Sequence, residues 1–475
     1  MAVTSDVPIA VGPDRNHLRP AARLEALLDP GSVSLIQEDD GVLAVRGRID
    51  GADVVAFCTD ATIKGGALGL RGARVVVGAT DTAVRENSPV IGLWHSGGAQ
   101  LAAGVRSLQG AGEMFAAMTR ASGKVLQVSV VLGPAAGAAA YGPALTDVVV
   151  LADAGRIFVT GPEVIRSVTG EEVDMAGLGG PEAHGPRSGV AHVIASSEAD
   201  ALARARRIVS LVQRPDRPHP VRDGADPDPG RHLPARPARA YDIHPVIRDL
   251  LDAPDDPTAF EEFQPRWANN VVVGFGRLTG RAVGIVANNP LRKGGCLDSP
   301  SAEKAARFVR TCDAFGVPLV VLVDVPGYLP GTDQEWNGVV RRGAKLLHAF
   351  AEATVPRVTV VLRKAFGGAF IAMNCQALGA TAVYAWPGAE VAVMGPEAAV
   401  KVLHRKTLAA TPPELQAQVL AELVQQHVED AGGVRDAIEI GAVDEVIEPG
   451  DTRAVVAAAL RGADSLRGEH GNIPL

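Results

Sequence analysis

The chain has 475 residues, which is too long for one ordinary hydrophobic core and favours two or three domains. Hydrophobic residues make up 47% and charged residues 21% of it, a globular composition that excludes the disordered and fibrous classes. The formal charge of −8 comes from acidic and basic residues mixed along the chain, and without a long basic run we expect no nucleic-acid partner.

Residues 1–20 are rich in proline and polar side chains, which predicts a loose N-terminal arm. They lack the basic start and the apolar stretch of a signal peptide. Nowhere does the sequence contain the roughly 18 consecutive apolar residues that a transmembrane helix needs. We therefore expect a cytoplasmic protein that does not bind a membrane.

The first elements after the arm are predicted from the spacing of apolar residues. Leu24, Leu27 and Leu28 share one face of a short amphipathic helix. The apolar runs at 42–45 and 54–57 predict strands, and the turn signals around them, such as Asp50-Gly51, are typical of hairpins.

The chain contains an internal repeat. Three pairs of segments share one offset of 229 residues, namely 47–51 with 276–280, 64–66 with 293–295, and 89–95 with 318–324. With a slip of one residue, 128–132 then matches 358–362, and 160–163 matches 394–397 after a small insertion. Independent coincidences do not share an offset, so we predict two domains of one fold in tandem.

The predicted domains are joined by a linker. Residues 214–240 are dense in Pro, Arg and Asp, and a short helix is predicted at 246–251. Each repeat alternates apolar strands with helical patterns, for example 301–309 before the strand 319–323, which favours an α/β fold with ββα-type units. We predict an arm at 1–20, a first domain at 21–213, a linker with a bridging helix at 214–265, and a second domain at 266–475.

Several common catalytic motifs are missing. The sequence has no P-loop, no G-x-S-x-G nucleophile elbow, no H-E-x-x-H zinc motif and no A-M-K-M-like segment for attaching biotin. The cysteines, at 58, 296, 312 and 375, show no C-x-x-C spacing, so we expect no metal site. An enzyme that uses a nucleotide or carries its own biotin is therefore not expected.

Glycine-rich turns remain as candidates for chemistry, at 95–99, 133–142, 325–331 and 367–369. Glycine and alanine allow a flat ligand to approach the main chain, and N–H groups at a helix start are oriented toward negative charge. The stretches 133–141 and 363–370, which contain two of these turns, follow β-branched strands at matching places in the two repeats. We predict that these two turns hold two oxyanions.

Longer stretches carry a family resemblance. They are 95–99 (HSGGA), 142–147 (GPALTD), 160–165 (TGPEVI), 168–171 (VTGE), 301–308 (SAEKAARF), 325–335 (VPGYLPGTDQE) and 389–395 (AEVAVMG). From about residue 20 to the C-terminus the chain resembles the carboxyltransferase (β) subunits of acyl-CoA carboxylases. Within that family it is most similar to the actinobacterial acetyl-/propionyl-CoA carboxylase β subunits, and it lacks the zinc ribbon of the other bacterial acetyl-CoA type.

The resemblance implies a fold of two tandem crotonase-like ββα spiral domains, of the ClpP/crotonase superfamily. It also implies a homohexamer, a trimer of dimers, in which each active site lies between the N-domain of one chain and the C-domain of another. A separate α subunit would contain biotin carboxylase and the biotin carrier, so the implied cofactor is biotin, as carboxybiotin on the partner's carrier domain. Whether a small accessory subunit takes part stays open.

The chemistry implied by this family needs two oxyanion sites. Carboxybiotin releases CO2, the ureido nitrogen takes the α proton of the acyl-CoA, and the resulting enolate attacks CO2. Negative charge develops on the thioester oxygen and on the ureido oxygen, where backbone N–H groups would bind it. The chain is therefore expected to carboxylate acetyl-CoA, propionyl-CoA or both, to malonyl-CoA or methylmalonyl-CoA, without a side-chain base.

The family's site residues can be carried over to matching positions. The pair for the thioester corresponds to Gly137 and Ala138, and the pair for biotin corresponds to Gly368 and Ala369. Further positions expected to contact the substrate are Gly97, Gly98, Ala99, Gly133, Ala136, Tyr141, Gly367 and Ile371. Gly327 and Tyr328 are expected to contact biotin together with Gly368 and Ala369.

The sequence departs from the family pattern at four positions. Ala138 replaces a common glycine but keeps its N–H, and Gln100 replaces an arginine near the CoA entrance. His95 replaces a common aspartate and is expected to be a hydrogen-bonded core residue rather than a catalyst. Ile371 stands where many propionyl-type members have aspartate, which implies either wider acceptance of shorter acyl groups or ordinary packing.

Other functions stay open. A biotin-linked acyl-CoA decarboxylase or transcarboxylase subunit would present the same site, and a non-catalytic subunit could organise a carboxylase complex. An enoyl-CoA hydratase or isomerase would need carboxylates at the turns. Glu163 and Glu397, the acids that repeat within a matching motif, are expected at helix starts instead.

Overall fold

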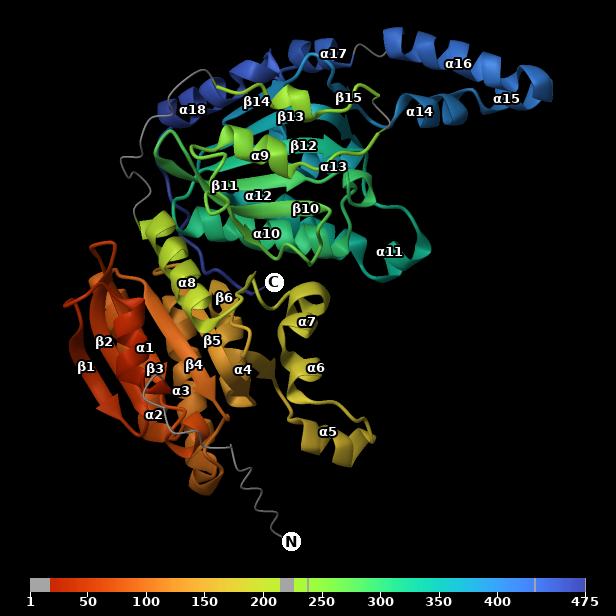
Figure 1. Cartoon of the computed structure of the whole chain (residues 1–475). Coiled ribbons are helices and arrows are strands. Elements are labelled where there is room, and N and C mark those ends of the chain that lie inside the picture. The colour runs from red at the N-terminus through yellow and green to blue at the C-terminus, as the bar shows by residue number, and fades with distance from the viewer. Residues whose placement is uncertain (1–17, 214–225, 237–238, 431–432, 475) are drawn as a thin grey trace. The chain divides into compact units, whose positions relative to one another are not determined.

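The computed structural model describes residues 18–213, 226–236, 239–430 and 433–474, which form two compact units (Figure 1). The first unit comprises the described part of Met1–Ala121 together with Gln127–Ala183 and Ile194–Arg206. The second comprises Ser122–Leu126, His184–Val193 and the described part of Arg207–Leu475. Residues 1–17 of the predicted arm and parts of the predicted linker lie outside the described residues, and the predicted domain boundaries stay a prediction.

The elements alternate between strands and helices as predicted. Up to α8 they are α1 (Pro20–Leu27), β1 (Ser34–Asp39), β2 (Val42–Ile49), β3 (Ala52–Thr59), α2 (Leu70–Glu86), β4 (Val90–Ser96), α3 (Val105–Ala121), β5 (Gln127–Ala136), α4 (Ala138–Leu145), β6 (Val148–Leu151), β7 (Arg156–Phe158), α5 (Pro162–Thr169), α6 (Met175–Gly179), α7 (Pro181–Ala183), β8 (Val193–Ile194) and α8 (Glu198–Gln213). From α9 on they are α9 (His244–Leu250), β9 (Glu261–Phe263), β10 (Val271–Leu278), β11 (Arg281–Asn288), α10 (Ser299–Ala314), β12 (Leu319–Val325), α11 (Thr332–Trp336), α12 (Val339–Glu352), β13 (Arg357–Phe366), α13 (Gly367–Ala372), β14 (Ala382–Ala385), β15 (Glu390–Ala392), α14 (Pro396–Leu403), α15 (Arg405–Ala410), α16 (Pro413–Asp430), α17 (Val434–Glu439), β16 (Glu445–Val446) and α18 (Thr452–Gly462). Short 3-10 helices at Lys64–Gly66 and Lys293–Gly295 occupy matching places in the repeat.

Each unit is built around a mixed sheet with the same strand pattern. In the first the order is β1-β2-β3-β4-β5-β6-β8 with β7 beside β5, and in the second it is β9-β10-β11-β12-β13-β14-β16 with β15 beside β13. The pairs β2–β3 and β10–β11 are antiparallel, whereas β3–β4–β5–β6 and β11–β12–β13–β14 are parallel. Figure 1 shows β1 to β6 of the first sheet in red to orange and β10 to β13 of the second in green to cyan. The predicted α/β fold of two similar tandem domains is confirmed.

The repeat extends to side-chain contacts. In each unit an aspartate accepts hydrogen bonds from two backbone N–H groups at the turn of the antiparallel hairpin and pairs with an arginine from a later helix. The two sets are Asp29 with Asp50, Gly51 and Arg206 of α8, and Asp252 with Thr279, Gly280 and Arg453 of α18. These contacts hold each hairpin against the later helix of its unit. The number of residues between equivalent members of the two sets varies.

The core of the second unit lies around its parallel strands. Strand β12 is buried along its whole length, as expected of a parallel strand covered on both faces. The core cluster includes Val246, Ile247, Ile285, Val320, Val358, Val456 and Leu460, from α9, the sheet and α18. Burying each such side chain stabilises the fold by roughly 1.5–3 kcal/mol.

Among the described helices none combines the length and the apolar character needed to cross a membrane.

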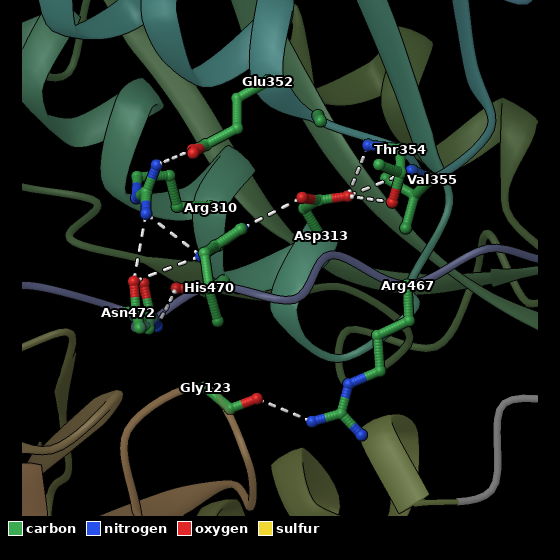
Figure 2. Close-up of polar contacts among 12 residues, drawn as sticks. Gly123, Arg310, Asp313, Glu352, Thr354, Val355, Arg467, His470 and Asn472 are labelled. Carbon is green, nitrogen blue, oxygen red and sulfur yellow. Dashed lines mark hydrogen bonds and ion pairs between the residues drawn. The ribbon is translucent and has the colours of Figure 1, made fainter. Parts of the chain in front are cut away.

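The segment that follows α18 is fixed by polar contacts within the second unit (Figure 2). The buried carboxylate of Asp313 pairs with His470 at 3.0 Å. Arg467 donates to the carbonyl oxygen of Gly123 at 2.7 Å, and Asn472 is fully buried. These contacts connect a segment without regular secondary structure to the rest of the second unit.

Candidate functional site

The two predicted glycine turns follow the central parallel strands at matching places. Gly137, with φ 55°, links β5 to α4, and Gly367, with φ 59°, is the first residue of α13, directly after β13. Both residues have a positive φ, which glycine adopts without strain. A Cβ on Gly367 would lie 2.9 Å from the carbonyl oxygen of Val393, so this turn requires glycine for space as well.

The N–H groups in the first turn of a helix have no acceptor within that helix. In the first unit the Gly137 N–H donates to the carbonyl of Phe158 in β7 at 3.0 Å, and the Ala140 N–H donates to the Gly137 carbonyl at 3.0 Å. Gly137 therefore provides the bend, and α4 presents the N–H groups of Ala138 and Ala139. Of the predicted pair, Gly137 has its N–H already bonded, and Ala138 has its N–H in the first turn of α4.

In the second unit the corresponding N–H groups belong to Gly368 and Ala369. Gly368 is exposed, and no atom lies within 4 Å of the position that its Cβ would take. The similar φ of Gly137 and Gly367 makes Gly368 the counterpart of Ala138. Gly368 and Ala369, the pair predicted in the second repeat, therefore correspond to Ala138 and Ala139 of α4. The pair predicted in the first repeat, Gly137 and Ala138, begins one residue earlier.

The predicted substrate loop 97–99 lies beside the first turn. Gly98 has φ 102°, and a Cβ there would lie 2.8 Å from the carbonyl oxygen of Ala136. The Gly98 N–H donates to the hydroxyl of Ser96 at 3.2 Å, and Ala99 forms an isolated bridge with Leu68. The structure therefore brings the loop 97–99 together with the end of β5.

Gly98→Ala is expected to lower the free energy of unfolding by about 1–3 kcal/mol, because alanine is strained at this φ and its Cβ would crowd Ala136. Gly97→Ala is the matched control, since Gly97 is exposed and the nearest atom is 3.5 Å from its ideal Cβ. The control should change stability by no more than about 0.5 kcal/mol. Urea unfolding measures both variants, and a Gly98→Ala chain as stable as the wild type would contradict the close approach.

Gly133 lies in β5 against the ring of His95. Three ring atoms of His95 lie 2.6 Å from the position that a Cβ on Gly133 would take. Burial, with a smaller effect of the nearby Arg23, lowers the pKa of His95 to about 4. His95 is therefore neutral at pH 7 and packs as a ring, which fits a core residue rather than a catalyst.

Tyr141 and Ile371 lie on the short helices that follow the turns. The Tyr141 ring is 49% exposed and meets Phe115 edge-on, with 6.2 Å between the ring centroids. Ile371 on α13 is 46% exposed. Both side chains are therefore about half-exposed beside the two glycine turns at 137 and 367.

Gly327 and Tyr328 lie in the loop after β12. The Gly327 carbonyl accepts a hydrogen bond from the N–H of Leu297 at 3.1 Å, and Tyr328 forms an isolated bridge with the same leucine. The Tyr328 hydroxyl lies 3.0 Å from the position of a Cβ on Gly343 of α12. Burial raises the pKa of Tyr328 to about 12. The structure therefore directs this side chain at α12.

The sequence did not predict a groove that lies beside the second turn. It has a volume of about 380 Å³ and is lined by Lys364, Phe366, Glu390, Gly395, Pro396, Glu397, Ala398 and Lys401. Glu397 pairs with Lys401 at 2.5 Å, and this hydrogen bond lowers the pKa of Glu397.

Glu163 and Glu397 lie in the first turns of α5 and α14, as predicted. Lys364 and Phe366 are two residues apart on β13 and therefore share one face of the strand. This spacing is the feature of the sequence that could have predicted the groove.

The chain is similar to known proteins over its whole length. The model of the carboxyl transferase domain matches residues 24–467. The chain is 57% identical over 476 residues to a biotin-dependent acetyl-/propionyl-coenzyme A carboxylase β6 subunit of Mycobacterium tuberculosis, with 100% of both chains covered. It is 56% identical over 459 residues to a propionyl-CoA carboxylase β chain of Rhodococcus erythropolis, with 96% of each covered.

Solved structures show the same similarity. Transcarboxylase 12S, described as a hexamer with methylmalonyl-CoA bound, matches with a TM-score of 0.88 and 39% identity, over 96% of this chain and 92% of that one. A single-chain, multi-domain long-chain acyl-CoA carboxylase matches with a TM-score of 0.81 and 25% identity, over 93% of this chain and 46% of that one. The similarity spans both units, which confirms the fold of two tandem crotonase-like domains.

Proposed function

Because the chain belongs to the carboxyl transferase family, among the β subunits of acetyl-/propionyl-CoA carboxylases, we propose that it transfers a carboxyl group from carboxybiotin to acetyl-CoA or propionyl-CoA. The products are malonyl-CoA and methylmalonyl-CoA. The observation that carries the proposal is the matched pair of donor turns, one at the end of β5 and one at the end of β13.

The first turn serves the acyl-CoA. We assign the N–H groups of Ala138 and Ala139 to the thioester oxygen. That oxygen gains negative charge as the α proton leaves, so the hydrogen bonds strengthen toward the transition state and lower its energy. Gly137 shapes the turn, and we assign residues 97–99, Gly133 and Ala136 to the adjoining wall, which the close approach of Gly98 to Ala136 supports.

The second turn fits a flat cyclic urea such as biotin. Gly368 is exposed with open space above it, so a ring can approach the N–H groups of Gly368 and Ala369. When bound, carboxybiotin supplies the carboxyl group in an activated form. The two N–H groups hold and orient its ureido oxygen, and Gly367 makes the turn that aims them. Gly327 and Tyr328 are assigned to biotin on the family resemblance alone.

Ile371 is proposed to influence acyl length. It lies on α13, four residues after Gly367, and its apolar side chain is half-exposed. An apolar side chain at this position favours acceptance of the acetyl group beside the propionyl group. Its counterpart among the substrate contacts of the first repeat, Tyr141, is proposed to cover the ligand from α4.

The chain is proposed to act in a larger assembly. Transcarboxylase 12S, its structural relative, is a hexamer, which supports a homohexamer built as a trimer of dimers. The relatives named biotin-dependent support a separate α subunit that carries biotin carboxylase and the biotinylated carrier. We further propose that one site uses the first repeat of one copy and the second repeat of another. The need for an accessory subunit and a cytoplasmic location are predictions from the sequence.

The function is tested by mixing the purified chain with a biotinylated carboxylase α subunit, ATP and labelled bicarbonate. Label should enter acetyl-CoA, propionyl-CoA or both, and the ratio of the two rates tests the role of Ile371. No product from either acyl-CoA, with an α subunit that charges its biotin normally, would contradict catalysis. That result would favour a non-catalytic subunit that organises the complex.

A second candidate is favoured by the similarity to transcarboxylase 12S. Donor turns stabilise the same transition state in both directions, so the site also suits transfer from a carboxylated acyl-CoA to biotin. Label that leaves methylmalonyl-CoA readily, while none enters propionyl-CoA from carboxybiotin made with bicarbonate, would favour this candidate.

A further inference from the structure

Each unit carries the same irregularity between its central strands. Trp94 pairs with Val131 and Ser96 with Ala135 in the first unit, and Val323 pairs with Val361 and Val325 with Ala365 in the second. One residue of the shorter strand therefore faces three residues of the longer strand. His95 faces 132–134, and Asp324 faces 362–364. The longer strand bulges here, immediately before the donor turn.

In the second unit a buried ion pair fills this bulge. The side chain of Asp324 is 1% exposed, and its Oδ2 accepts a hydrogen bond from Nε of Arg363 at 3.0 Å. Its Oδ1 accepts one from the backbone N–H of Lys364 at 3.3 Å. Arg363 also donates to the carbonyl of Arg239 at 3.0 Å, and its guanidinium lies 5.1 Å from the ring centroid of Tyr241. Asp324 thereby bonds two of the three bulged residues.

In the first unit a different pair of residues occupies the same two positions. His95 aligns with Asp324, and Gly133 aligns with Arg363, as the strand pairing shows. The ring of His95 packs on Gly133, which has no side chain. The same backbone bulge is therefore supported by different residues in the two repeats. In the first repeat the ring of His95 packs on Gly133, and in the second the carboxylate of Asp324 pairs with Arg363.

We propose that Asp324 is a positioning residue for carboxyl transfer, because its bonds to Arg363 and Lys364 fix the bulge that aims the N–H groups of Gly368 and Ala369. This inference rests on the proposed function of that turn. Loosening the bulge should cost transition-state stabilisation more than substrate binding, since a misplacement of about 1 Å can cost on the order of 10²-fold in rate.

The test uses the purified full-length chain with malonyl-CoA and free biotin. The carboxyl group moves from the α carbon to the ureido nitrogen and the nitrogen's proton moves to the carbon, which gives acetyl-CoA and carboxybiotin. Asp324→Asn should lower kcat about 10- to 100-fold and leave the KM for malonyl-CoA within about threefold. Asparagine can still accept from Lys364, but it cannot pair with Arg363 as a carboxylate does.

A rescue variant takes its design from the first repeat. The double substitution Asp324→His, Arg363→Gly copies His95 and Gly133 and should return kcat to within about fivefold of wild type. Asp252→Asn is the matched control, because Asp252 also binds an arginine and two backbone N–H groups, but at the hairpin. It should lower the melting temperature and keep kcat within about twofold of wild type.

Amide hydrogen exchange supplies a readout that needs no activity. Exchange at 364–369 should rise in Asp324→Asn and stay unchanged in Asp252→Asn. A wild-type kcat in Asp324→Asn, an equal loss of kcat in Asp252→Asn, or a folded double variant no faster than the single one would each overturn the inference. A wild-type chain that converts no malonyl-CoA would instead overturn the proposed function, and the exchange data would still decide whether Asp324 fixes the turn.

Discussion

Gly368→Pro is expected to lower kcat for carboxyl transfer by about 10²–10³-fold, the usual loss for one oxyanion donor. Proline has no N–H, so the second turn loses one of the two donors that we propose for it. The backbone should tolerate the change, because a first-turn N–H makes no bond within its helix. No atom lies within 4 Å of the position of the new Cβ, so that part of the proline ring has room. The measurement is kcat in the assay with the charged α subunit.

Gly368→Ala is the matched control for this variant. It adds the same Cβ but keeps the N–H, and the counterpart position in the first repeat is Ala138, which shows that such a turn accepts alanine. We expect a loss below about tenfold. Equal losses of kcat in both variants would show that the added Cβ causes the loss. A proline variant with the wild-type kcat in an intact assembly would show that the Gly368 N–H is not an oxyanion donor.

Ala138→Pro is expected to cause a loss of similar size, about 10²–10³-fold in kcat, through the thioester oxygen. Ala138 is the first residue of α4, the helix position at which proline is best tolerated, so the fold should persist. Ala138→Gly keeps the N–H and should stay within about threefold of wild type. Steady-state rates at saturating carboxybiotin make the comparison, and an active proline variant would contradict the assignment of Ala138.

The fold could be predicted because the internal repeat can be detected in the sequence itself. The segments 89–95 and 318–324 share one offset with two other pairs, and they became the equivalent strands β4 and β12. Their β-branched and apolar residues are buried on both sides, so the pattern reports directly on the sheet. The glycine turns could be located because each follows such a strand.

The finer geometry of the site depends on pairings that no local pattern encodes. The Gly137 N–H is bonded because β7 returns about 20 residues later to pair with the end of β5. Asp324 and Arg363 are 39 residues apart, and only the register of β12 on β13 brings them together. The sequence held one clue to the second contact, since the repeat aligns His95 with Asp324, two residues of unlike chemistry at one position.

The central claim is that one site needs the first turn of one copy and the second turn of another, and mixed assemblies test it most directly. Ala138→Pro and Gly368→Pro chains carry different tags, are expressed together, and the assemblies that hold both are purified. In a mixed dimer one site carries both changes and the other carries neither.

Random pairing makes half of the dimers mixed, so the account predicts that roughly one quarter of the wild-type kcat returns, although each variant alone is nearly inactive. Activity of the verified mixed assemblies no higher than that of either variant alone would contradict the account.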